Sequence, residues 1–284
     1  MRPSVWIFCC VVTAVGGMSA VVARGSVDHS DFSAELSRAL ADFDRGQQIL
    51  DERPDRARQL FRSAAQRLSS IVSAGIVNGR LEYNLGNCYL QAGDVGEAIL
   101  HYLRARRLMP RDPLLADNLA QARSRCLMTI QPTRRSAVLR NVFFWHYDTS
   151  LTSRSHAAIA LYVVFWILLA IRAFMPRPGV TLSAVAALAL TVILAGSVGL
   201  QHWVDQHAPG GVVTTMDVTV HKGPGTGYQR QFEQPLQPGV EFTLLEERPG
   251  WWNIELPDRK TGWTDSSAGK LITPLPTHAK LGGS

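Results

Sequence analysis

The side chains best suited to metal chemistry lie in the short run HWVDQH, which contains His202, Asp205 and His207. Imidazole and carboxylate groups are common zinc ligands when they converge on one point. At 3.6 residues per turn, this spacing does not place all three side chains on one face of a helix. We therefore interpret them as polar residues of a linker at a membrane surface, and we predict no metal site.

Other patterns that indicate catalysis are missing from the 284-residue sequence. It contains no nucleophile elbow, no zinc-protease helix and no paired cysteine motif, and its acidic residues form no catalytic pair. Gly223, Gly225 and Gly227 do not predict a nucleotide loop, because no helix N-terminus follows them to hold a phosphate. We predict a protein that is not an enzyme and needs no cofactor.

The elements around these residues begin with residues 79–112, which have the spacing of one full tetratricopeptide repeat. The residues at its signature positions are Leu85, Gly86, Tyr89, Ala98, Tyr102, Ala105 and Pro110. Gly86 and Ala98 are small where two antiparallel helices cross closely, and Pro110 ends the second helix. Repeats of this kind recognise other polypeptides, so the pattern predicts a binding scaffold.

One repeat cannot bury its own apolar face, so neighbouring helices are required. Residues 32–49 and 54–74 are predicted to form a helical hairpin upstream of the repeat. Downstream, Leu119 and Ala120 continue the repeat spacing, which predicts a terminal capping helix. The predicted α-helical tetratricopeptide-repeat domain covers residues 30–130.

Five residues of the first repeat helix point toward the concave wall of such an array. They are Arg80, Tyr83, Asn87, Leu90 and Gln91. We expect them to bind an extended peptide or a helix of a partner protein. The plainer alternatives are a solvated Gln91 and a packed Leu90.

Residues 1–23 have the charged, apolar and small-residue regions of a secretory signal peptide, with an uncleaved anchor helix as the alternative. Cys88 and Cys126 follow it, and we expect buried free thiols, although an exported domain would permit a disulfide.

The net charge of +6 is spread over many arginines rather than gathered in one patch. We therefore predict no nucleic-acid partner, and phospholipid head groups are the simpler partner for arginines near a membrane.

Two apolar stretches, residues 157–175 and 179–200, are predicted to be transmembrane helices, since about 20 apolar residues cross a bilayer. A buried hairpin of a soluble protein is the alternative. Arg172 and Arg177 lie between the spans without an acid, as in a cytoplasmic turn.

Four arginines ahead of the first span alone favour the opposite orientation; they are Arg134, Arg135, Arg140 and Arg154. Because the signal peptide starts translocation, we expect both soluble domains on the periplasmic side of a bacterial inner membrane. We also expect the spans to isolate these two domains from each other. Residues 137–155 are predicted to be a juxtamembrane segment that lies in the interface or packs on the last repeat helix.

Residues 211–274 contain short β-rich runs broken by turn sequences such as KGPGTG and PDRKTG. The residues that follow a known pattern are Val218, Val220, Gly223-Pro224-Gly225, Tyr228, Pro238-Gly239-Val240, Gly250-Trp251, Ile254 and Gly262-Trp263. With them the segment resembles the bacterial Src-homology-3-like domain, which implies a small all-β barrel of about five strands. Residues 275–284 are expected to be a disordered tail.

Trp251 and Trp252 are consecutive, so a strand sends them to opposite faces. An exposed Trp252 beside Tyr228 would hold a peptide or a glycan. A tryptophan that shields the barrel edge is the alternative.

The order of these parts predicts a multidomain membrane protein and resembles the BatE-type proteins of bacterial aerotolerance operons, with the stretch NGRLEYNLGN especially close. The resemblance implies an exported scaffold that accompanies von Willebrand A-domain proteins and a MoxR-type ATPase, and so binds other membrane or periplasmic proteins. The alternatives are a sensor or anchor that binds peptidoglycan through the barrel, and an accessory subunit of a wall enzyme.

Overall fold

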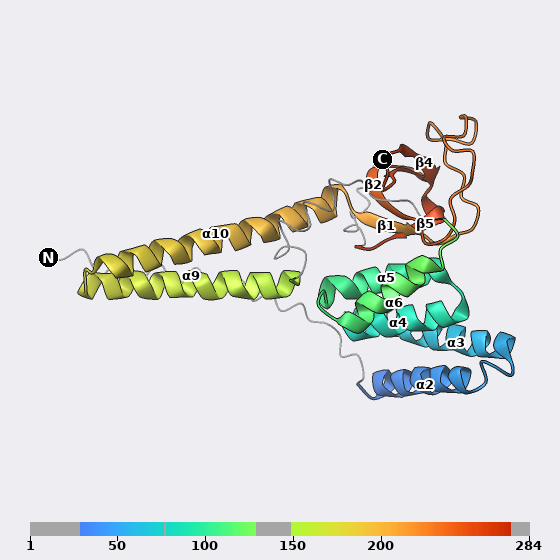
Figure 1. Ribbon diagram of the computed structural model, residues 1–284, viewed down its shortest axis with the longest axis horizontal. Helices are drawn as coiled ribbons and strands as arrows, with labels where there is room; N and C mark the ends of the chain where they lie inside the picture. Colours follow the sequence, from blue (N-terminus) through green and yellow to red (C-terminus); the bar gives the residue numbers. More distant parts are fainter. Residues whose placement is uncertain (1–28, 77, 129–148, 274–284) are drawn as a thin grey trace, which may run out of the picture.

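The computed structural model describes residues 29–76, 78–128 and 149–273 (Figure 1). The predicted signal peptide, most of the juxtamembrane segment and the C-terminal tail lie outside the described residues. The described part consists of a helical array, a long helical hairpin and a β-sheet, in that order along the chain.

The helical array has five antiparallel helices. They are α2 (His29–Gln48), α3 (Pro54–Ser73), α4 (Gly79–Ala92), α5 (Val95–Leu108) and α6 (Pro113–Ser124). Local chemistry sets the ends of α4, since the Asn78 side chain accepts a hydrogen bond from the Arg80 amide and Gly93 has a φ of +88°. The predicted upstream hairpin, repeat and capping helix are therefore confirmed as helices.

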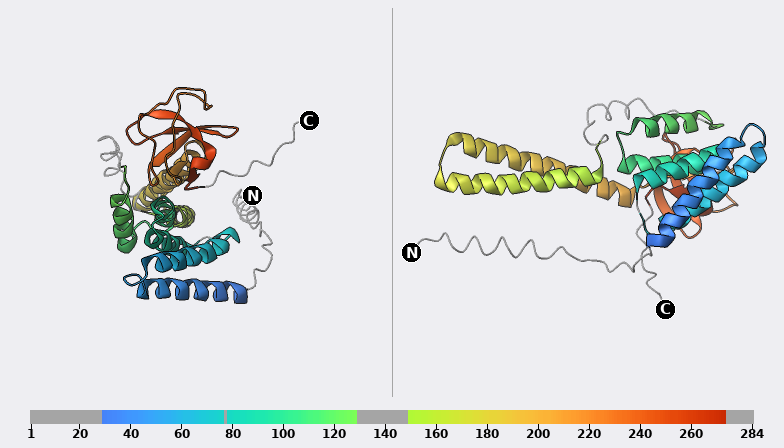
Figure 2. Two further views of the ribbon diagram at one scale, coloured as in Figure 1. Left: turned by 90° about the vertical axis from the view of Figure 1, so that its right-hand side faces the viewer. Right: turned by 90° about the horizontal axis from the view of Figure 1, so that it is seen from below.

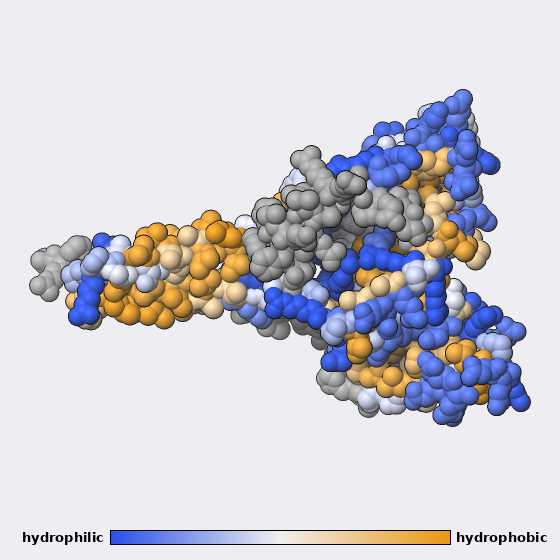
Figure 3. All heavy atoms as spheres, viewed as in Figure 1, coloured by the Kyte–Doolittle hydropathy of each residue, from blue (hydrophilic) through white to orange (hydrophobic). Residues whose placement is uncertain are grey.

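The hairpin consists of α9 (Leu151–Phe174) and α10 (Pro178–His207), which lie side by side and project away from the rest of the protein (Figures 1 and 2). Both helices are long and apolar enough to cross a membrane. Their apolar side chains face outward, and Figure 3 shows the hydrophobic surface that covers most of the hairpin. Both helices extend beyond the predicted spans at the end nearest the soluble parts.

The sheet has five antiparallel strands in the order β4-β3-β2-β1-β5. Their bounds are β1 (Gly210–Val213), β2 (Glu241–Arg248), β3 (Trp251–Glu255), β4 (Thr261–Asp265) and β5 (Gly269–Leu271). The number of strands matches the prediction, but the predicted barrel is wrong in one respect, because the sheet does not close. The short edge strand β5 is covered by α5 instead, where Arg104 donates hydrogen bonds to the carbonyls of Leu271 (2.8 Å) and Ile272 (3.2 Å).

The sheet packs directly on the helical array at one end of the hairpin (Figures 1 and 2). The expectation that the spans isolate the two soluble parts is therefore wrong. The chain leaves the array, runs out and back through α9 and α10, and returns as β1 against α5. We call the array and the sheet together the head.

Candidate partner-binding surfaces

The crossing of α4 and α5 is the close approach that the repeat pattern predicts. A Cβ atom added at Gly86 would overlap the ring of Tyr102, so only glycine fits there. Burial raises the pKa of Tyr102, and its hydroxyl donates a hydrogen bond of 2.7 Å to Asn87 Oδ1. Apolar packing therefore joins the two helices at the crossing, and the Tyr102–Asn87 hydrogen bond joins them at its edge.

Helix α6 extends this polar contact to the predicted groove. Asn118 Nδ2 donates to the Tyr83 hydroxyl at 2.8 Å and to Asn87 Oδ1 at 2.9 Å. The structure therefore brings Tyr83 and Asn87 together, both half-buried, on the side of α4 that faces α6. Sequence reasoning missed Asn118, which only the position of the capping helix reveals.

The other three predicted groove residues differ in exposure. Arg80 is exposed and Gln91 is half-buried, whereas Leu90 is only 3% exposed and packs in the apolar core. The open part of this surface is consequently formed by Arg80 and Gln91, with the Tyr83–Asn87 pair beneath it. Partner binding by these residues remains a prediction.

A buried acid–base pair lies between α4 and α5. Glu82 Oε2 and His101 Nδ1 are 2.6 Å apart, and the imidazole stacks on the ring of Tyr89. On the far side of the imidazole, Glu97 binds Lys270 of β5 at 2.6 Å. A row of ionisable side chains therefore runs from the repeat core to the sheet. Sequence reasoning missed this row, since neither Glu82 nor His101 occupies a signature position.

The contact between α5 and the sheet depends on two glycines. A Cβ at Gly96 would lie 2.6 Å from the carbonyl oxygen of Val213. Gly239 has a φ of +98° and lies against Cys126, so a side chain would be strained there and would overlap the thiol. Beside this contact, Arg123 of α6 forms an ion pair of 2.7 Å with Glu241 of the sheet.

The aromatic residues of the sheet are arranged differently from the expectation. Trp252 is buried in the sheet core, where its indole N–H donates to Glu247 at 3.2 Å, and Trp251 is the half-buried member of the pair. Tyr228 is 54% exposed. His221 lies between Trp251 and Tyr228, because its ring meets the Trp251 ring edge-on and its Nδ1 lies 2.9 Å from the Tyr228 carbonyl oxygen. The exposed aromatic surface therefore consists of Tyr228, His221 and Trp251 rather than Tyr228 and Trp252.

The polar run at residues 202–207 was predicted to lie in a linker, but the structure places it in the last turns of α10. Its three titratable side chains bind different partners: His202 pairs with Gln206, His207 with the Trp203 carbonyl, and Asp205 with Arg107. Across the part of the chain that the structure describes, no three His, Cys, Asp or Glu side chains are grouped to hold a metal ion.

The described cysteines are both free thiols, as predicted. Cys88 is buried in the repeat core, and this burial raises its pKa to about 12. Cys126 is half-buried beneath Gly239, and burial raises its pKa as well. The two thiols therefore report on two different places, the repeat core and the contact with the sheet.

Comparison with known families gives one match, since residues 80–112 match the tetratricopeptide repeat family. The match coincides with α4 and α5 and the turn that follows them. No curated protein and no solved structure matches the chain. The repeat suggests a scaffold for protein–protein interaction, because repeats of this class bind protein partners.

Proposed function

We propose that this chain is a non-enzymatic, membrane-anchored scaffold. The hairpin of α9 and α10 holds it in a bilayer, and the repeat helices bind partner proteins. The observation that carries this proposal is the position of the head, which packs as one unit at one end of an outward-facing apolar hairpin. Surfaces as apolar as those of α9 and α10 mark a contact with lipid or with other apolar surfaces.

The antiparallel hairpin also supports the topology of the proposal. If both helices span, the two parts of the head are on one side, as their direct contact requires, and residues 175–177 are on the other. The predicted signal peptide and the basic turn with Arg172 and Arg177 favour a periplasmic head on the bacterial inner membrane.

Cysteine labelling tests this topology. A cysteine introduced at the exposed Met216 of the head should react with an impermeant reagent in intact spheroplasts. One introduced at Pro176 in the turn should react only after permeabilisation. The reverse pattern would place the head in the cytoplasm and overturn the proposed localisation.

The partners follow from the resemblance to BatE-type proteins. We infer that the head binds von Willebrand A-domain proteins and a MoxR-type ATPase of an aerotolerance or envelope-stress assembly. The accessible side chains of the repeat, Arg80 and Gln91, are the first place to look for the contact.

Co-purification from detergent with a matched control tests partner binding. Arg80→Glu combined with Gln91→Ala should reduce partner recovery several-fold, because both changes are on the open surface of α4. Arg56→Glu makes the same charge change on the exposed side of α3 and should leave recovery unchanged. Equal recovery for the two variants would remove this surface from consideration.

The exposed aromatic surface of the sheet favours a second candidate function, the recognition of peptidoglycan. Aromatic rings stack on sugar faces, and Tyr228 is the most accessible of the three. Tyr228→Ala should abolish sedimentation of the full chain with purified wall material, whereas Met216→Ala, at another exposed position of the sheet domain, should not. Failure of the parent chain to sediment would exclude this candidate and leave the scaffold proposal intact.

A further inference from the structure

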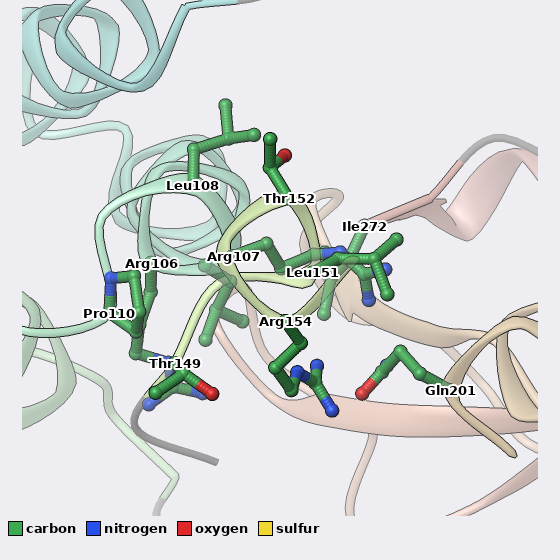
Figure 4. Close-up of a pocket in the computed structure, with 11 residues that line it drawn as sticks. Arg106, Arg107, Leu108, Pro110, Thr149, Leu151, Thr152, Arg154, Gln201 and Ile272 are labelled. Atoms are coloured by element: carbon green, nitrogen blue, oxygen red, sulfur yellow. The ribbon is translucent and has the colours of Figure 1, made fainter. Parts of the chain in front are cut away.

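A cavity of about 380 Å³ lies where the hairpin joins the head (Figure 4). It is open on one side and is lined by the end of α5, the start of α9, the end of α10 and the residue after β5. Its polar lining is formed by Arg106, Arg107, Thr149, Thr152, Arg154 and Gln201, and Leu108 and Leu151 add apolar walls. This cavity belongs to neither of the surfaces described above.

Arginines are the charged residues among the described residues that line the cavity. Three guanidinium groups line it, those of Arg106, Arg107 and Arg154, and no acidic residue is among the lining residues that the structure describes. Arg107 forms an ion pair with Asp205. Arg154 is 5% exposed and donates to Ser197 at 2.7 Å, so its guanidinium is held in place. In Figure 4 this guanidinium points toward Gln201.

The cavity lies at the depth where the apolar surface of the hairpin ends. The apolar run of α9 begins at Ala157, and Arg154 precedes it by less than one turn, or roughly 5 Å along the axis. The apolar run of α10 ends at Leu200, and Gln201 is the next residue. In a bilayer both residues would lie among the lipid head groups, which is where arginines meet phosphate.

We propose that this cavity binds the phosphate of an anionic phospholipid. The proposal rests on the membrane anchoring proposed above. The guanidinium groups hold the phosphodiester by charge-assisted hydrogen bonds, and Leu108 and Leu151 lie beside its glycerol and first methylene groups. The N-terminus of α9, which starts at the cavity, adds the positive end of a helix dipole. A bound lipid would thereby fix the angle between the hairpin and the head.

Native mass spectrometry of the detergent-purified full chain tests the proposal, with phosphatidylglycerol and phosphatidylcholine as probes. The parent chain should retain one phosphatidylglycerol in preference to phosphatidylcholine. Arg106→Gln and Arg154→Gln should each weaken this retention at least about fivefold, as expected for one charge at a membrane surface. Arg154→Lys keeps the charge and should restore part of it. Arg172→Gln, at the opposite end of α9, is the matched control and should match the parent.

Four results would overturn the proposal. Equal retention of the two lipids by the parent, or equal retention by all variants, would exclude a head-group site. Displacement of the lipid by millimolar inorganic phosphate would assign the cavity to a soluble phosphate instead. Alkaline extraction of membranes tests the membrane anchoring separately. Release of the chain by carbonate would refute the membrane proposal, and the lipid-site proposal would fail with it.

Discussion

The protein contains two antiparallel helix pairs of opposite character. In α4 and α5 the apolar residues lie between the helices and toward their neighbours, and the outer face is polar. In α9 and α10 large apolar side chains point outward, and Ile167 and Leu182 are 53% and 72% exposed. The two pairs thus use the same motif in opposite ways, since the first pair buries its apolar surface and the second exposes it.

Glycine also has opposite meanings in the two pairs. Gly86 of α4 faces the ring of Tyr102, where no added atom fits. Gly196 and Gly199 of α10 have open space around the position of a Cβ atom. In the first pair the small residue permits a close crossing, whereas nothing in the structure explains the glycines of the second.

The largest expected effect comes from the buried Glu82–His101 pair between α4 and α5. His101→Leu leaves the Glu82 carboxylate in the core without its partner, which should lower the free energy of unfolding by about 3–5 kcal/mol. Modification of Cys88 by a thiol reagent in rising urea measures this, in a Cys126→Ser background, because the buried thiol reacts only when the repeat opens.

A double variant is the control for this prediction. Glu82→Leu with His101→Leu replaces both charged partners by apolar groups and should recover most of the lost stability. If the single variant unfolds within about 1 kcal/mol of the parent, the pair contributes little to the α4–α5 contact, and the comparison must rest on apolar packing alone.

The second prediction tests whether the exposed side chains of α9 face lipid and those of the helical array face water, by placing a lysine on each. Ile167→Lys puts a charge on the outward face near the middle of α9, which should disfavour membrane insertion by about 2.5–3.5 kcal/mol. Leu114→Lys puts the same charge on an exposed position of α6, where water already surrounds the side chain. The membrane fraction after carbonate extraction should fall for Ile167→Lys alone. Equal fractions would mean that α9 does not face lipid.

The third prediction compares one substitution at two glycines. Gly86→Ala should destabilise the repeat by about 1–3 kcal/mol, because the methyl group must displace the ring of Tyr102. Gly196→Ala has room for its methyl group and should leave stability unchanged or slightly raise it. Urea titrations followed at Cys88 measure the first change, and thermal melting of helicity by circular dichroism compares both. Similar melting for the two variants would mean that the repeat register is wrong.

What the sequence predicted correctly depends on short-range spacing. Gly86 and Tyr102 are 16 positions apart and belong to one repeat, so a fixed pattern reveals their contact. The helix limits near Asn78 and Gly93 likewise follow from local capping chemistry. The strands of the sheet also follow from runs and turns, although their closure does not, because closure depends on what covers the edge at β5.

The contact between the array and the sheet could not be predicted in this way. Arg104 and Leu271 are 167 positions apart, and no period in the sequence relates them. The alternation of a strand predicts that Trp251 and Trp252 face opposite sides, but which side is the core depends on the packing of the whole sheet. The cavity of three arginines has the same origin, since it brings together four segments that are distant along the chain.

The smallest expected effect concerns the ion pairs that join the sheet to α5. Lys270→Ala removes the bond to Glu97, which should weaken the contact by about 0.2–1 kcal/mol. The labelling rate of the Cys126 thiol measures the strength of this contact, because the sheet covers the thiol at Gly239. In Lys270→Ala this rate should rise by up to about fivefold at low salt. Cys88 should remain unlabelled, which separates lifting of the sheet from unfolding of the repeat.

Lys270 is a better residue to substitute than Arg123, because removing Arg123 would itself change the reactivity of the Cys126 thiol. Arg123 lowers the pKa of the Cys126 thiol while Glu241 raises it, so Arg123→Ala would reduce the thiolate fraction and hide any gain in access. Lys260→Ala, which breaks an ion pair with Asp258 inside the sheet domain, is the matched control. Labelling that is equal for Lys270→Ala and Lys260→Ala at low salt would show that the ion pair adds nothing to the contact. The close approaches at Gly96 and Gly239 would then hold the sheet against the helical array without help from this ion pair.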